Sequence, residues 1–192
     1  MCKDNQQSKE NKKTITYDIW RKLIDHIYFN CHALATSARI LLKQNITENE
    51  KWNVNDPPYV AAGLYTYAVE EYGKILFLLE KKPSNYENIT INYKKFLDHQ
   101  HKFRRALEKL PNKCKKLHTG GFSNSGFTSS GFNTDTIADF EARKAIFYTD
   151  FDSDKVKELP EVNSKKLDVA LNKFIYIIET ELEDFHKTFQ IR

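Results

Sequence analysis

Apolar residues recur at steps of three and four along most of the chain, which is the spacing of helices that bury one face. This pattern predicts helices over residues 15 to about 44, 57 to about 80, 86 to 110, 135 to 148 and 164 to 189. No alternating stretch is long enough to predict a strand. The expected fold class is therefore all-α, with about five helices packed as an antiparallel bundle.

Helix start and stop signals support the second of these helices. Asp56-Pro57 provides an N-cap residue followed by proline at the first helical position, which is a strong start signal. Lys81-Lys82-Pro83 provides basic residues and a following proline, which is the expected stop.

A repeat of Gly-Phe followed by small polar residues interrupts the helical pattern over residues 121–133. Glycine and serine favour an open backbone, so residues 111–134 are expected to form a flexible insertion. The repeat can be a simple flexible loop, or an arm whose phenylalanines dock on a partner or stack on bases. The sequence leaves both possibilities open.

Length and composition describe one ordinary globular domain. The 192 residues suit a polar N-terminal tail over 1–14 and a single helical domain over 15–192. The net charge of +4 permits acidic partners without requiring them, and three widely spaced cysteines indicate reduced thiols. The polar start and the lack of an 18-residue apolar run predict a cytoplasmic protein that does not bind membranes.

The second helix carries the charged cluster Glu70-Glu71-Tyr72-Gly73-Lys74. Glu71 falls on the apolar stripe between Ala68 and Ile75, whereas Glu70 can be ordinary surface. The cluster is interpreted either as a surface salt bridge between Glu70 and Lys74, which are four residues apart, or as a buried polar site that involves Glu71 and Lys74. A glycine inside a helix costs roughly 1 kcal/mol relative to alanine, so Gly73 is expected to mark the close approach of another helix.

Two further clusters could carry chemistry. His99-Gln100-His101-Lys102 places His99 and Lys102 three residues apart on one helical face. Arg143 precedes Tyr148-Thr149-Asp150 at the end of the short fourth helix. Phosphate-loop, nucleophile-elbow and zinc-protease motifs are absent, and no metal-ligand cluster is visible, so no cofactor and no metal are expected.

In this order and spacing, the three clusters resemble the AbiV family of bacterial abortive-infection proteins. That family pattern is Glu-Glu-x-Gly-Lys, then His-x-x-Lys, then Arg followed by Tyr-x-Asp, and the resemblance covers about residues 30 to 185. The family is grouped with the HEPN helical superfamily, many of whose members are metal-independent ribonucleases. The Arg-x(4–6)-His pair of those nucleases is matched only by Arg21 and His26, on the first helix rather than a late one.

The resemblance implies phage defence by arrest of growth or translation, set off by a phage-encoded activator protein. Two mechanisms stay open: a metal-independent endoribonuclease, or a non-catalytic helical switch that binds a phage protein or the translation machinery. As a ribonuclease, the chain would use the candidate catalytic residues Glu71, Lys74, His99, Lys102, Arg143, Tyr148 and Asp150. His99 would be the base or acid, the cations would hold the phosphate of RNA, and the carboxylates would orient them. A homodimer is expected, because the many aromatic residues offer more apolar surface than a small bundle hides.

Overall fold

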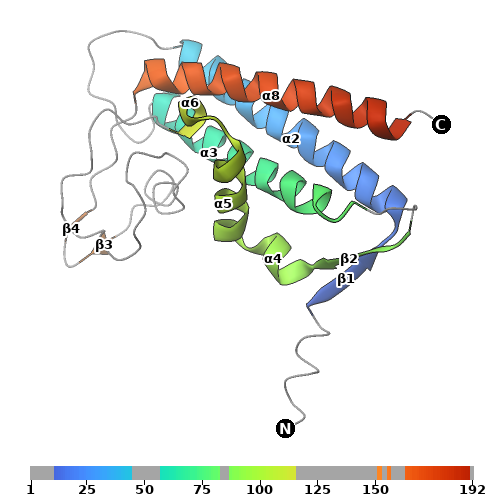
Figure 1. Ribbon diagram of the computed structural model, residues 1–192. Coiled ribbons are helices and arrows are strands. Elements are labelled where there is room, and N and C mark those ends of the chain that lie inside the picture. The colour runs from blue at the N-terminus through green and yellow to red at the C-terminus, as the bar shows by residue number, and fades with distance from the viewer. Residues whose placement is uncertain are drawn as a thin grey trace.

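The computed structural model shows three long helices lying side by side, with shorter helices packed against two of them (Figure 1). The structure describes residues 11–44, 57–82, 87–115, 151–152, 155–156 and 163–190. Within these residues helix predominates, which confirms the predicted all-α class.

The long helices are α2 (Tyr17–Gln44), α3 (Pro57–Leu79) and α8 (Ser164–Gln190). Helices α2 and α8 each bury one apolar face, whereas α3 is apolar on more than one side. Helix α2 is antiparallel to both α3 and α8 and packs against both (Figure 1). The indole N–H of Trp20 on α2 donates to the carbonyl of Leu78 on α3 at 2.9 Å, which fixes one end of this packing.

A small antiparallel sheet lies at one end of the long helices (Figure 1), although no strand was predicted. Strand β1 (Lys12–Ile15) pairs with β2 (Ile89–Asn92), and Lys12 lies opposite Asn92. Ile15, Ile89 and Ile91 are buried under the sheet. Part of the predicted polar tail is therefore a strand. A second pair, β3 (Phe151–Asp152) and β4 (Lys155–Val156), is only two residues long on each side.

The predicted third helix is wrong as one continuous element. Its first residues form β2, and the rest divides into α4 (Tyr93–Leu97) and α5 (His99–Lys109). Asp98 has extended backbone angles and separates the two helices, and its carboxylate accepts a hydrogen bond from the backbone N–H of His101 at 3.2 Å. Asp98 therefore caps α5 and lets it take a new direction across α3. A further short helix, α6 (Asn112–Lys115), packs against α8.

Several large apolar side chains stay exposed on the outer faces of α2 and α8, including Phe29, Ile40, Val169 and Tyr176. They are compatible with the predicted homodimer, which stays a prediction. Among the described residues, no helix is both long enough and apolar enough to cross a membrane.

Candidate acid–base site at the crossing of α3 and α5

At Gly73 the backbone of α5 approaches α3 very closely. A Cβ atom built on Gly73 would lie 2.6 Å from the carbonyl carbon of Lys102 and 2.9 Å from its Cα, and closer still to its carbonyl oxygen. Carbon atoms of non-bonded groups do not approach so closely, so only glycine fits this position. The predicted close approach of another helix at Gly73 is confirmed.

Glu70 lies one turn before Gly73, at the same crossing. Its Oε1 accepts hydrogen bonds from Nδ1 of His99 at 2.6 Å and from Nζ of Lys102 at 2.9 Å. The side chains of Glu70 and Lys102 are only 5% and 3% exposed, whereas His99 is 49% exposed. A buried ion pair thus holds one edge of a half-exposed imidazole. We call Glu70, His99 and Lys102 the crossing cluster.

The hydrogen-bond chemistry of the crossing cluster fixes the state of the histidine ring. An ionised carboxylate can only accept hydrogen bonds, so the proton in the short contact with Glu70 sits on Nδ1 of His99. Proton exchange with a substrate would therefore go through Nε2. The position of His99 at the first residue of α5, capped by Asp98, sets where the ring stands.

The sequence pattern predicted that Glu71 is the buried carboxylate of this cluster, and this prediction is wrong. Glu71 is 18% exposed and forms an ion pair with Lys74, three residues along the same helix, whose side chain is 21% exposed. Glu70, which had been interpreted as ordinary surface, is the buried one. The predicted site residues therefore separate into two groups: His99 and Lys102 meet at Glu70, while Glu71 and Lys74 pair with each other.

Lys102 also differs from its predicted role. Its ammonium group is buried against Glu70, so it neutralises that carboxylate rather than facing solvent where a phosphate would bind. The remaining predicted site residues, Arg143, Tyr148 and Asp150, lie outside the described residues.

A second polar network, missed by the sequence interpretation, lies next to the crossing cluster. Nε of Arg105 donates to Nε2 of His101 at 2.9 Å, the Arg105 guanidinium pairs with Glu80, and it also lies over the Phe77 ring at 5.2 Å. Burial and the neighbouring Arg105 cation lower the pKa of His101. The ring is thus neutral and accepts the Arg105 hydrogen bond. The four-residue spacing of His101 and Arg105 was the available signal.

Because its folded-state pKa is lowered, His101 makes stability depend on pH. In the unfolded chain His101 takes up a proton near its ordinary pKa of about 6.5, while the folded chain resists protonation. The unfolded state therefore binds more protons as pH falls through this range, and stability falls with it. Urea unfolding between pH 7.5 and 5 should show this loss for the wild type, and a shallower loss for H101Q. Parallel curves for the two proteins would contradict this assignment.

A third polar group ties α2 and α3 to α8. The hydroxyls of Tyr28 and Tyr72 donate to the two carboxylate oxygens of Glu181, at 3.3 Å and 2.9 Å. Burial raises the pKa of Glu181, which the two tyrosine hydrogen bonds partly oppose, and burial also raises the pKa of both tyrosines. These residues fix the register of three helices. No spacing in the sequence links them, because the contacts join segments more than 100 residues apart.

No group of three or more histidine, cysteine, aspartate or glutamate side chains among the described residues is arranged to hold a metal ion. Comparison with models of protein families, with curated proteins and with solved structures found no match to this chain.

Proposed function

We propose that this chain is a phage-defence protein that cleaves RNA without a metal ion, with His99 as its general acid–base residue. The observation that carries the proposal is the crossing cluster, in which a buried, neutralised carboxylate holds a half-exposed imidazole by one nitrogen. An acid–base group oriented by a second side chain, which is itself fixed by a third, is the arrangement that proton-transfer catalysis needs. The order of the three motifs resembles that of the AbiV family, and this resemblance supports a role in phage defence.

In the proposed cleavage reaction, Nε2 of His99 acts as the general base. It takes the proton of a ribose 2′-hydroxyl, the 2′-oxygen attacks the adjacent phosphorus, and the bond to the 5′-oxygen of the next nucleotide breaks. The leaving 5′-oxygen takes a proton from a solvent water, and the His99 imidazolium returns its proton to the hydroxide that remains. The products are a 2′,3′-cyclic phosphate and a 5′-hydroxyl end. Glu70 stabilises the imidazolium that forms, and the Lys102 ammonium pairs with Glu70 in its buried position.

A basic and aromatic surface on β1 and α4, the helix that directly precedes His99 in the chain, supports RNA as the substrate. Lys12, Lys13, Lys94 and Lys95 are all exposed on β1 and α4, and α4 ends two residues before His99. Nζ of Lys13 lies 5.3 Å from the centre of the Tyr93 ring, which stacks on Phe96. Clustered lysines attract the phosphate backbone, and exposed aromatic rings can stack on unpaired bases.

H99A should abolish phage protection while leaving the protein folded. A general acid–base residue contributes roughly 10²- to 10⁴-fold to a rate, so its loss should return plaque counts to the level of cells without the gene. The measurement is plating efficiency on cells that express each variant at equal protein level. H101Q is the matched control, because it changes the second histidine of the same helix and should keep protection.

Protection by H99A equal to that of the wild type would contradict the catalytic role of His99 and favour the non-catalytic switch. Lack of protection by the wild type against every phage tested would contradict the defence role itself.

A further inference from the structure

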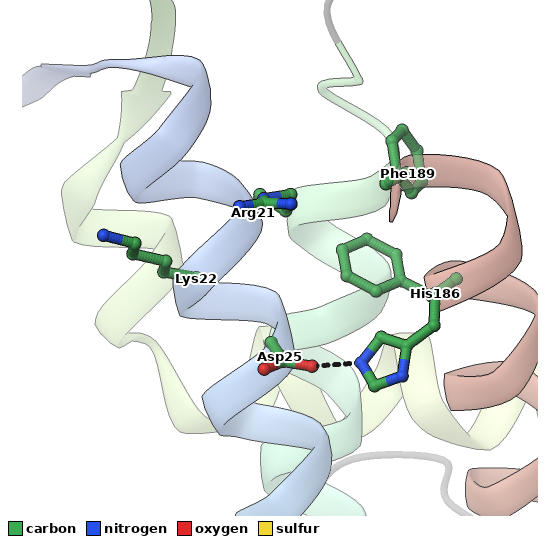
Figure 2. A pocket seen from close by; sticks show the side chains of 6 residues that line it. Arg21, Lys22, Asp25, His186 and Phe189 are labelled. Carbon is green, nitrogen blue, oxygen red and sulfur yellow. Dashed lines mark hydrogen bonds and ion pairs between the residues drawn. The ribbon is translucent and has the colours of Figure 1, made fainter. Parts of the chain in front are cut away.

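A small hollow lies between α2 and α8, on a different pair of helices from the crossing cluster. It measures about 110 Å³ and is lined by Arg21, Lys22, Asp25, Phe185, His186 and Phe189 (Figure 2). The α2 residues come from the first turns of that helix and the α8 residues from its last turns. The hollow therefore stands at the end of the bundle where α2 begins and α8 ends.

An acid–base pair crosses this hollow. Nε2 of His186 lies 2.5 Å from Oδ1 of Asp25, and both side chains are 32% exposed (Figure 2). The carboxylate can only accept, so the proton of this hydrogen bond is on Nε2. Asp25 thus fixes the orientation of the His186 ring at an opening that solvent reaches.

Positive charge surrounds the same opening. Arg21 is one helical turn before Asp25 and faces the hollow with it, while Lys22 extends away from His186 in the view of Figure 2. Nζ of Lys82, from the segment after α3, lies 4.8 Å from the centre of the Phe189 ring. Arg21 and Lys22 thus bring two cations to the lining beside the Asp25 carboxylate, and Lys82 adds a third against the Phe189 ring.

The walls of the hollow are aromatic. Phe185 and Phe189 lie with their ring centres 4.7 Å apart, and Phe185 is almost fully buried. Apolar walls lower the local dielectric constant and so strengthen attraction between the cations and an anion. Arginine is well suited to such a site, because its planar guanidinium donates two parallel hydrogen bonds to phosphate oxygens.

Size limits what can enter. Pockets that enclose whole small molecules measure about 300–1,000 Å³, so a hollow of about 110 Å³ admits only one small group of a larger ligand. The basic side chains, the two parallel N–H donors of the Arg21 guanidinium and this small volume together suit a terminal phosphate group.

We propose that the α2–α8 hollow binds a phosphate monoester, with the Arg21 guanidinium as its donor, while His186, held in place by Asp25, lines the same hollow. The rest of the ligand would lie outside the hollow. This proposed site does not depend on RNA cleavage at His99. Binding measurements alone can therefore test it.

The test is isothermal titration calorimetry of the full chain with four probes: inorganic phosphate, adenosine 5′-monophosphate, and one short RNA with either a 5′-phosphate or a 5′-hydroxyl end. The H99A background prevents turnover of the RNA. The 5′-phosphorylated RNA should bind at least tenfold more tightly than its 5′-hydroxyl form if the site recognises RNA ends. Preference for adenosine 5′-monophosphate or for inorganic phosphate over either RNA would instead assign the site to nucleotides or to free phosphate.

R21A should weaken the binding of the preferred probe at least tenfold. R39A is the matched control, because it removes the same charge from α2 at a site where Arg39 contacts Asn172 on α8. Equal weakening by R21A and R39A would mean only diffuse charge attraction and would overturn the proposal. Failure of all four probes to bind at millimolar concentration to a protein with wild-type circular dichroism would also overturn it.

Discussion

E70Q should destabilise the protein by about 3–5 kcal/mol, the cost usually seen when one partner of a buried ion pair is removed. Lys102 would keep its charge with its side chain only 3% exposed, and a neutral amide compensates that charge poorly. Most domains have only about 5–15 kcal/mol of stability in total, so this loss is large. The measurement is urea unfolding at pH 7, compared with the wild type.

The neighbouring residue offers a matched control for this prediction. E71Q makes the same chemical change one position along α3, but its ion pair with Lys74 is partly exposed and should be worth no more than about 1 kcal/mol. The double variant E70Q/K102M removes both charges and should recover part of the stability lost in E70Q. A cost for E70Q no greater than that for E71Q would contradict the burial assigned to Glu70.

G73A should also destabilise the protein, although its intrinsic effect in a helix has the opposite sign. Alanine is favoured over glycine by about 1 kcal/mol inside a helix. Here the added methyl group would overlap the backbone of Lys102, which cannot move away without shifting α5. Overpacking of this kind typically costs about 1–3 kcal/mol, so a net loss is expected in urea unfolding.

Hydrogen exchange can localise the effect of G73A. Amide protection should fall mainly in α5, because that helix must move to admit the methyl group. N30A, at an exposed position inside α2, is the control and should leave stability unchanged or slightly raised. A more stable G73A protein would show that α5 does not approach α3 as closely as described.

The sequence predicted well those features that depend on one helix at a time. The periodicity placed α2, α3 and α8 nearly at their observed ends, and the helix-breaking cost of Gly73 correctly indicated a helix crossing. It missed β1 and β2, because each strand has only four residues and Lys12 pairs with Asn92 without a hairpin turn between them. It missed the break at Asp98, where an N-cap residue stands inside an otherwise helical pattern.

The choice between Glu70 and Glu71 failed for a different reason. Helix α3 is buried on more than one side, against α2 and against α5, so its apolar residues do not define a single stripe. A carboxylate that seemed to lie beside the stripe is the one facing α5. Which of two adjacent residues faces a neighbour depends on where that neighbour lies, and local spacing does not contain this information.

In the proposed function, the crossing cluster cleaves RNA through His99. The most direct measurement is sequencing of RNA ends from infected cells that carry the wild-type chain or H99A. We expect new 2′,3′-cyclic phosphate and 5′-hydroxyl ends in wild-type cells after infection, and none above background in H99A cells. Intact RNA in wild-type cells that are nevertheless protected from phage, or the same new ends in H99A cells, would contradict it.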